Sequence, residues 1–329
     1  MIDLKGAVAA ARGEQQHMLG KILYFSISRI LVDKTELEKL CRSMGITFGR
    51  GHRLAVVDAF RSATGDVRGR VISKKSGELK IHQVYCRDNQ RTSSDVISRE
   101  LVKETLNQET NQYEKLANIS FDRKNRLFSY DNLVFDDDVD AAEYCRQAED
   151  LFDLYQTCAN RKQIETLCVN FLRSLEATKL LGKGHIYFVP RHTMERVDLF
   201  EDFVTEVANL DRSGRVDTKG DKPISANSIY IIDDAKQRDK MADAFYSTVK
   251  EEIEKYQERA DYFIKSGCRS VAVMERWVLR IQSLEEKKRH YEAVLRRELD
   301  GLDEEFSALK LLSQELAIRA QGLRLQKAA

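Results

Sequence analysis

The stretch RGRVISKKSGELKIHQVYCRD, residues 68–88, decides the fold of the central part of this chain. It holds two runs in which apolar and polar side chains alternate, and Lys75-Ser76-Gly77 joins them. Alternation with a period of two is typical of a β-strand with one buried face, and a short link containing glycine is typical of a hairpin turn. The stretch therefore predicts an antiparallel β-hairpin.

The alternation continues beyond this hairpin. DVISRELVKETLN (95–107) and YEKLANISFD (113–122) alternate again, and FDRKNRLFSYD (121–131) turns at Lys124-Asn125. Short polar links between alternating runs are typical of consecutive antiparallel strands. We expect an antiparallel meander of about five strands over residues 68–131, with one polar face and one core face.

A strand and two helices are expected before the meander. GKILYFSIS (20–28) has the apolar and aromatic composition of a buried strand. DKTELEKLCRSMG (33–45) starts with a helix-capping pair, Asp33 and Glu36, and ends with a glycine that can close a helix. AVVDAFRSATG (55–65) predicts a second short helix that ends at its glycine.

Helical spacing begins after the meander. Apolar residues recur every three to four positions over 139–158 and 161–181, and Gly182-Lys183-Gly184 is the expected end of the second helix. The strand HIYFV (185–189) and a helix over 193–209 follow, and SIYIID (228–233) predicts one more strand. This middle segment therefore predicts a small α/β unit.

The chain from Ala235 onward carries only helical patterns, with breaks expected at Gly267 and Gly301. Its apolar positions are spaced alternately by four and three residues, as in a coiled coil or a helical hairpin. So long an apolar seam needs a covering surface, either within the chain or on another subunit. The seam residues that we predict to mediate self-association are Trp277, Ile281, Leu284, Tyr291, Leu295, Leu302, Phe306, Leu309, Leu316 and Leu323.

These patterns together predict an α+β protein with three consecutive parts. Residues 1–137 form a mixed domain with the antiparallel β-meander, residues 138–234 form the small α/β unit, and residues 235–329 form a coiled-coil or helical-hairpin arm. The apolar seam of the arm is longer than a helix needs in order to dock on a small domain. We therefore expect it to pack against another copy of the chain in a homo-oligomer.

The composition limits the classes of function. Lys and Arg number 54 and Asp and Glu number 53, so no overall field attracts nucleic acid or an anionic membrane. The six cysteines are scattered without a metal-binding or redox spacing, which is typical of buried thiols in a reducing compartment. No segment approaches the ~20 apolar residues of a membrane span, and we expect a cytoplasmic protein that is not bound to a membrane.

Two segments contain histidine or carboxylate side chains that could bind a metal ion or act as an acid or base. His192, Glu195 and Asp198 follow a strand, but their spacing of three and six residues does not place all three on one helix face. Asp233-Asp234 also follows a strand, as in metal-dependent nucleases, yet a helix cap explains the pair equally well. The chain has no phosphate-binding glycine loop and no nucleophile motif. We therefore predict no catalytic residue, no metal ligand and no cofactor.

One basic stretch is a candidate for contact with nucleic acid. It contains Arg61, Arg68, Arg70, Lys74 and Lys75 on the loop and hairpin that open the meander. Cations along a hairpin can follow a phosphate backbone. The alternative is a solvated edge strand whose charges prevent the addition of further strands.

Three segments together resemble a bacterial and phage domain of unknown function. They are LGKILYFSISRILVDKTELEKL (19–40), VDAFRSATG (57–65) and HIYFVPRHTMERVDLFEDFV (185–204), and the order in which they occur is more specific than any one of them. The resemblance spans most of residues 19–260. The resemblance implies a prokaryotic or phage protein and is consistent with a mobile genetic element. It implies no established activity and no catalytic residue.

The sequence leaves three functional hypotheses. The first is a non-enzymatic, self-associating scaffold or interaction protein, because the chain shows a long helical surface and no catalytic motif. The second is a nucleic-acid-binding accessory protein of a phage, plasmid or defence system, which would use the basic hairpin. The third is a metal-dependent hydrolase.

Overall fold

Contacts group the chain into two units that differ from the three consecutive domains expected. The computed structural model describes residues 17–48, 54–75, 78–89, 95–106, 112–214 and 222–328. Unit 1 comprises Met1–Ser26, Leu167–Thr205 and Ile224–Ala329, and unit 2 comprises Ile27–Thr166 and Glu206–Pro223. The chain leaves unit 1 and returns to it because its first strand pairs with segments from the middle of the sequence.

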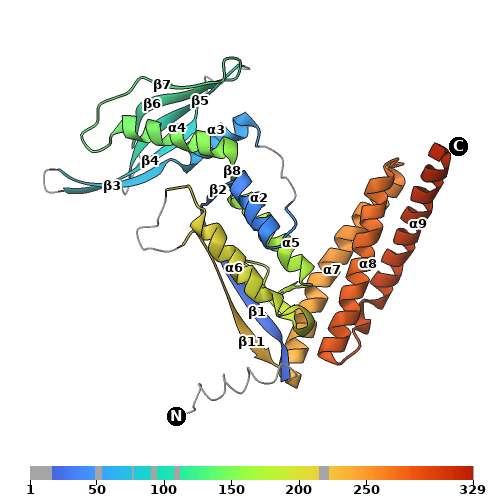
Figure 1. Ribbon diagram of the computed structural model, residues 1–329. Helices are drawn as coiled ribbons and strands as arrows, with labels where there is room; N and C mark the ends of the chain where they lie inside the picture. The colour runs from blue at the N-terminus through green and yellow to red at the C-terminus, as the bar shows by residue number, and fades with distance from the viewer. Residues whose placement is uncertain are drawn as a thin grey trace, which may run out of the picture. The chain divides into compact units, whose positions relative to one another are not determined.

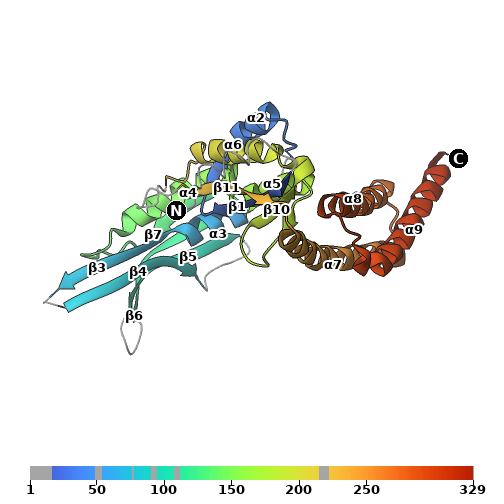
Figure 2. The ribbon, with the colours of Figure 1, turned by 90° about the horizontal axis from the view of Figure 1, so that it is seen from below.

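The antiparallel meander predicted over residues 68–131 is confirmed. Unit 2 contains a five-stranded antiparallel sheet whose strands follow one another in sequence order (Figure 1). The strands are β3 (Arg68–Lys75), β4 (Glu78–Asp88), β5 (Val96–Leu106), β6 (Gln112–Asp122) and β7 (Leu127–Asp131). Figure 2 shows β3 and β4 side by side along the hairpin. The hairpin residues Ser76 and Gly77 lie outside the described residues.

One face of this sheet packs against two helices, α3 (Val56–Asp66) and α4 (Ala141–Thr157). Phe60, Phe121, Phe128 and Phe152 form an aromatic cluster between sheet and helices, with ring centroids 5.1–6.4 Å apart. Gly69 also lies on this side, where an added Cβ would come within 1.9 Å of the Tyr144 hydroxyl. The apolar half of the alternating pattern is therefore the half that faces the helices.

The helix cap expected at Asp33 is confirmed. The Asp33 carboxylate accepts hydrogen bonds from the backbone N–H groups of Thr35 and Glu36, at the start of α2 (Lys34–Ser43). Gly45 follows the helix with a positive φ of 66°, a conformation that favours glycine. Strand β2 (Leu31–Asp33) leads into this helix and pairs with β8 (Cys158–Asn160).

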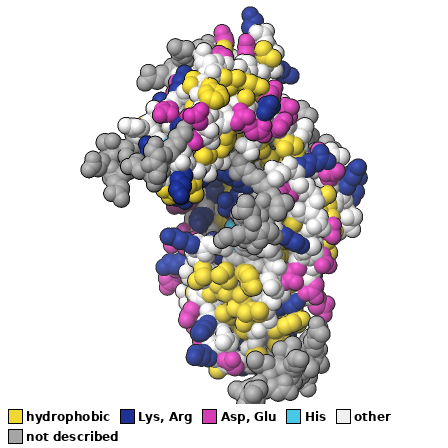
Figure 3. Space-filling model, turned by 90° about the vertical axis from the view of Figure 1, so that its left-hand side faces the viewer, with side chains coloured by type: hydrophobic (Ala, Val, Ile, Leu, Met, Phe, Trp, Pro, Cys, Tyr) yellow, Lys and Arg dark blue, Asp and Glu magenta, His cyan; other side chains and the backbone are white. Residues whose placement is uncertain are grey.

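Unit 1 contains a four-stranded sheet in the order β11-β1-β10-β9. The strands are β1 (Met18–Ile27), β9 (Thr178–Lys179), β10 (Ile186–Pro190) and β11 (Ile224–Ile232), and β1 runs antiparallel to β10. Phe25 of β1 packs against Phe200 of α6 (Arg196–Asn209). Hydrophobic side chains gather in the lower half of Figure 3, where β1 and β11 lie, and Tyr24 and Ile229 are exposed on these strands.

The helices expected from Ala235 onward are confirmed, and they pack within unit 1. They are α7 (Ala235–Lys265), α8 (Val271–Leu295) and α9 (Asp303–Ala328), which lie side by side in Figures 1 and 2, with a short 3-10 turn, η3 (Asp300–Leu302), before the last. The bend before α9 starts at Arg296, whose φ is +52°, rather than at Gly301.

The apolar seam is covered from within the chain. Buried seam residues are Ile281, Leu284, Tyr291, Leu295, Leu302, Phe306, Leu309 and Leu316, while Trp277 and Leu323 are partly buried. They contact one another and the apolar side of α7, including Phe245 and Ile253. Of the two arrangements left open by the sequence, packing within the chain accounts for this seam. Self-association through these residues stays a prediction without a free surface to support it.

One helix ends earlier than expected. Helix α5 (Arg161–Ser174) was predicted to continue to residue 181, but it ends before Glu176, whose φ is +55°. Thr178 and Lys179 then pair with β10 as strand β9. The prediction was wrong because no glycine or proline marks this helix end in the sequence.

The cysteines behave as expected from their spacing. All six are free, and all but Cys268 are buried. Burial raises the pKa of Cys41 and Cys145 to about 11 and that of Cys86 to about 12, which keeps these thiols protonated. Among the described residues, no helix is both long enough and apolar enough to cross a membrane.

Candidate functional sites

The open face of the unit 2 sheet is the face opposite α3 and α4. Residues directly across from each other in neighbouring strands share a face. Arg68, Tyr85, Val102 and Lys115 form one such row across β3–β6, and Arg70, Gln83, Glu104 and Tyr113 form the next. We call the residues of these and the adjoining rows the open face.

The basic residues predicted from the sequence divide between two places. Arg68, Arg70 and Lys74 alternate along β3, are exposed, and belong to the open face. Arg61 lies on α3, which packs against the opposite side of the sheet, so the structure does not bring it to the open face. Lys75 ends β3, and its side chain lies outside the described part of the chain.

Sequence reasoning missed the side chains that accompany these cations. Tyr113 is exposed on the open face, beside a half-buried Tyr85, and the Arg87 guanidinium lies 5.5 Å from the Tyr113 ring centroid. Ile72, Ile81 and Leu106 form a third cross-strand row, which is partly or largely exposed. The period-two pattern could have found them, because it places Ile72 on the same face as Arg70.

Acidic side chains on the open face are paired. Glu100 accepts hydrogen bonds from Arg87 (3.0 Å) and Lys115 (3.1 Å). Burial acts to raise the pKa of Glu100, but these two cations outweigh it and lower the pKa. Burial and hydrogen bonds to Glu104 and Tyr113 raise the pKa of Tyr85 to about 12. Among the described residues, Arg68, Arg70 and Lys74 form no ion pair with a carboxylate, and Glu104 lies in the same row as Arg70.

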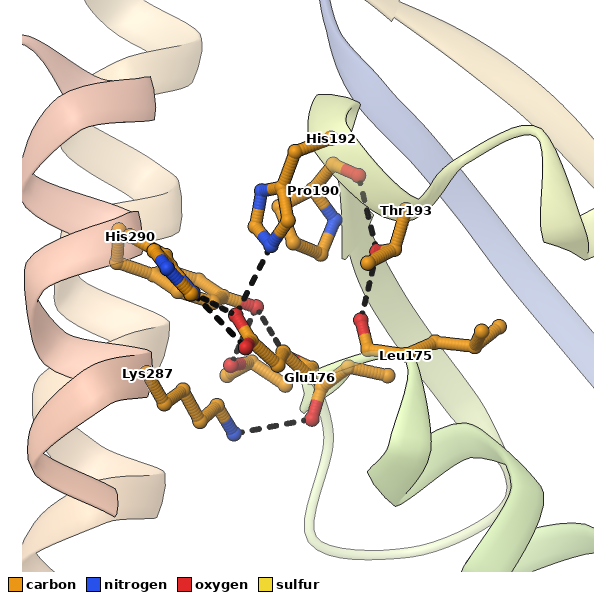
Figure 4. Close-up of polar contacts among 10 residues, drawn as sticks. Leu175, Glu176, Pro190, His192, Thr193, Lys287 and His290 are labelled. Atoms are coloured by element: carbon orange, nitrogen blue, oxygen red, sulfur yellow. Dashed lines mark hydrogen bonds and ion pairs between the residues drawn. The ribbon is translucent and has the colours of Figure 1, made fainter. Parts of the chain in front are cut away.

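A second site lies in unit 1, at the end of α5. Three consecutive backbone carbonyls there accept hydrogen bonds from distant side chains (Figure 4). Thr193 donates to Leu175 (2.7 Å), Tyr291 donates to Glu176 (2.9 Å) and Lys287 donates to Ala177 (3.1 Å). Leu175, Glu176 and Ala177 join α5 to β9, and these side chains satisfy the carbonyls of this turn.

The Glu176 carboxylate meets two histidines. His192, in the 3-10 turn η2 (Arg191–Thr193), has its Nε2 atom 2.9 Å from Glu176 Oε2. His290 of α8 has its Nδ1 atom 2.8 Å from Oε1 and 2.9 Å from Oε2. Figure 4 shows both rings pointing toward the carboxylate from different elements. We call Glu176, His192 and His290 the histidine cluster.

Burial and charge set the protonation of groups around the histidine cluster. Burial acts to raise the pKa of Glu176, but hydrogen bonds from both histidines outweigh it and hold the pKa below its usual value. Burial lowers the pKa of Lys287, which is only 9% exposed. Burial also raises the pKa of Tyr291, so its hydroxyl stays protonated and able to donate.

Glu176 also borders a pocket of 510 Å³ between α5, β9, α7 and α8. The pocket is rich in charge of both signs. Its basic lining residues are Arg173, Lys179, Lys255, Arg280 and Lys287, and its acidic ones are Glu176, Glu251 and Glu252. Five basic and three acidic side chains line it, and this mixture of charges alone indicates no particular ligand.

The acidic residues near His192 and after β11 lie outside the histidine cluster, and most of them make contacts of their own. Glu195 is exposed and Asp198 pairs with Lys21, so neither joins His192, as the spacing predicted. Asp234 caps α7, which confirms the capping interpretation, and Asp233 pairs with Arg238 and Arg296. The sequence missed Glu176 and His290, which lie 16 and 98 residues from His192 (192 − 176 and 290 − 192) and carry no local motif.

Comparison with known proteins gives a family and no activity. The model of a family described as "Family of unknown function (DUF6744)" matches residues 18–322. No curated protein and no solved structure matches the chain.

Proposed function

Because the chain belongs to DUF6744, a family of unknown function, its surface is the guide to its role, and we propose that it binds single-stranded nucleic acid on the open face. The observation that supports this most directly is that cations and tyrosines lie in neighbouring cross-strand rows of that face. Exposed Arg68, Arg70 and Lys74 stand on β3, Tyr85 stands on the neighbouring β4, and Tyr113 stands on β6, across β5 from β4.

These residue types suit the two parts of a nucleic acid strand. Arginine and lysine side chains contact phosphates and release their counterions. Tyrosine rings offer flat surfaces on which unpaired bases stack, each stack being worth ~1–3 kcal/mol. The exposed aliphatic row of Ile72, Ile81 and Leu106 extends the apolar surface next to the cations.

Single strands fit this face better than duplexes. In a duplex the base faces are stacked inside the helix, so the tyrosine rings would contact only the backbone. In a single strand the bases can turn toward the tyrosine rings while phosphates contact the cations on β3. The overall charge of +1 means that binding depends on this local patch rather than on the whole protein.

Protection of a sheet edge is the competing explanation for the cations on β3. It accounts for Arg68, Arg70 and Lys74, because β3 is an edge strand. It does not account for the exposed Tyr113 on β6, which lies at the other side of the open face. A nucleic acid strand crossing the sheet would use both.

Fluorescence anisotropy tests the proposal. Labelled single strands of DNA and RNA and a duplex of the same sequence are titrated with the protein at low salt. A length of about 20 nucleotides exceeds the site size of one single-strand-binding domain. The single strands should bind more tightly than the duplex. The variant Arg68→Glu/Arg70→Glu/Lys74→Glu should lose binding.

A matched control reverses the same amount of charge elsewhere in unit 2. Lys39, Lys124 and Lys162 are exposed and lie off the open face, so Lys39→Glu/Lys124→Glu/Lys162→Glu should bind as the wild type does. Equal losses in the two triple variants would indicate only a general charge effect. Absence of binding by the wild-type protein to either single strand at low salt would end the proposal.

Self-association is a second candidate function, supported by the outer side of α9. Leu311, Ile318 and Leu325 are 68%, 70% and 66% exposed and are spaced by seven residues, so they form one stripe along the helix. We call them the outer stripe, in contrast to the buried Leu309 and Leu316. Large aliphatic side chains in a regular row are typical of a helix that packs against another helix.

The spacing of the outer stripe favours a second copy of the same chain. With a two-fold axis at Ile318, two antiparallel α9 helices would place Leu311 of each opposite Leu325 of the other. Light scattering after size-exclusion chromatography should then show a dimer. Leu311→Glu/Ile318→Glu should be monomeric, whereas Leu279→Glu, an exposed leucine on α8, should remain dimeric. A monomeric wild-type protein at high concentration would exclude this function.

A further inference from the structure

We propose that Glu176, His192 and His290 form a binding site for a divalent transition-metal ion of the Zn²⁺ type. The histidine cluster is in unit 1, whereas the open face is in unit 2, so this inference is independent of nucleic-acid binding. It reverses the expectation from the sequence that the chain has no metal ligand.

The donor atoms are of the right kind and number. Each of the three residues offers one ligand atom, and these atoms all lie within 4.8 Å of one another. Two imidazole nitrogens and one carboxylate oxygen are the protein ligands of many catalytic zinc sites, where water takes the fourth position. The same set also binds Fe²⁺ in other proteins, so the donors favour first-row transition metals over Mg²⁺ or Ca²⁺.

The distances between the donors need little change. The carboxylate oxygens lie 2.8–2.9 Å from the histidine nitrogens. Ligands at the usual zinc distances are about 3.4 Å apart in a tetrahedral site. Small rotations of the two imidazole rings would open the required space, since His192 and His290 both have exposed side-chain surface.

The backbone at Glu176 indicates that its side chain is needed there. Glu176 follows the end of α5 in the left-handed conformation, with φ at +55°, a position where glycine is the usual residue. A residue that only closed the helix would gain nothing from a carboxylate. The hydrogen bonds from Thr193, Tyr291 and Lys287 to three successive carbonyls hold this segment, and Thr193 lies next to His192. Such fixed support is common around metal ligands.

The alternative is a purely structural cluster in which the two histidines donate to the carboxylate. In that arrangement both histidine rings donate a hydrogen bond to the Glu176 carboxylate. It predicts no affinity for metal ions. The two possibilities therefore differ in a direct measurement on the full chain.

The test uses protein purified without a histidine tag and stripped of metal with a chelator. Zn²⁺ is titrated by calorimetry, and the bound metal is measured by mass spectrometry after gel filtration. The wild type should retain one Zn²⁺ per chain. Thermal unfolding should shift to higher temperature with Zn²⁺, because an ion that binds only the folded state stabilises it.

Variants identify the ligands. Glu176→Gln, His192→Ala and His290→Ala should each lower the affinity for Zn²⁺ at least tenfold. Glu195→Gln is the matched control, because Glu195 is an exposed carboxylate three residues from His192 and outside the cluster. Circular dichroism of the metal-free variants shows whether each is folded, and three separate ligand variants make the result independent of any one that unfolds.

The results separate the two explanations. Stoichiometric Zn²⁺ that is lost in the three ligand variants and kept in Glu195→Gln supports the site. A wild-type protein that retains no Zn²⁺, or variants that retain as much as the wild type, would overturn it and leave the cluster as a structural ion pair.

Discussion

The hydroxyl of Tyr291 on α8 donates a hydrogen bond to the backbone carbonyl of Glu176, 2.9 Å away and 115 residues earlier in the chain. The same hydroxyl accepts a hydrogen bond from Thr178 at 2.7 Å. Tyr291 is completely buried, so its hydroxyl ties the end of α5 to the helical core. This single contact positions the residue whose carboxylate meets His192 and His290.

Tyr291→Phe should therefore destabilise the protein although the ring is kept. The variant leaves the Glu176 carbonyl and the Thr178 hydroxyl with one partner fewer in a buried place, which costs ~1–3 kcal/mol. Urea unfolding followed by circular dichroism measures the change. Tyr262→Phe, at an exposed tyrosine of α7, should change stability by less than ~0.5 kcal/mol. Equal stability of the two variants would show that the Tyr291 hydroxyl has no structural role.

The two sides of α9 should respond differently to charge. Leu309 and Leu316 are completely buried, so Leu309→Asp/Leu316→Asp places carboxylates in an apolar core and should cost several kcal/mol. Leu311→Asp/Ile318→Asp changes exposed side chains and should leave the thermal midpoint of a monomer nearly unchanged. Thermal unfolding compares them. Similar losses in both variants would mean that the buried and exposed sides of α9 are assigned wrongly.

Acid should weaken unit 2 through Asp136. The Lys103 ammonium and the Asp136 carboxylate form a buried ion pair, and Asp136 also accepts from the backbone N–H groups of Asp138 and Val139. Burial acts to raise the pKa of Asp136, but these partners outweigh it and hold the pKa below its usual value. A depressed pKa in the folded state adds stability above the unfolded pKa, and this stability is lost as the pH falls through the folded pKa.

The variant Asp136→Asn tests this dependence. It should cost about 3 kcal/mol at neutral pH, because Lys103 stays buried with only Glu114 as a charged partner. Its stability should also fall less steeply than that of the wild type below about pH 4. Denaturant unfolding over a pH series gives both quantities, with Asp137→Asn at the neighbouring exposed position as control. Parallel pH curves for wild type and Asp136→Asn would contradict the assignment.

Single substitutions should separate the contributions of base stacking and of charge to the affinity for nucleic acid. Tyr113→Ala should weaken binding by ~1–3 kcal/mol without changing the salt dependence, since no phosphate contact is lost. Arg70→Ala should reduce the slope of log affinity against log salt by about one unit. Tyr113→Phe retains the ring and should bind as the wild type does. If Tyr113→Ala binds normally while Arg70→Ala does not, the contact is electrostatic only.

Local patterns of residues were enough to predict several parts of the fold. Alternation with a period of two places Val71 and Arg70 on opposite faces of β3 wherever the strand lies. The Asp33 cap requires only the next three residues, and the helices from Ala235 onward follow from apolar spacing and the glycine after α7. These features need no contact with a distant segment, so they were predictable.

Which surfaces meet depends on long-range packing. The leucines of α9 look alike in the sequence, but packing against α7 and α8 buries Leu309 and Leu316 and leaves Leu311 and Ile318 exposed. Likewise, no local stop residue marks the end of α5, and side chains of Thr193, Tyr291 and Lys287 donate hydrogen bonds to the three carbonyls of the turn that follows it. Glu176 and His290 are 114 residues apart and meet because α8 packs beside that helix end. A site assembled by such long-range packing leaves no spacing in the sequence from which it could be recognised.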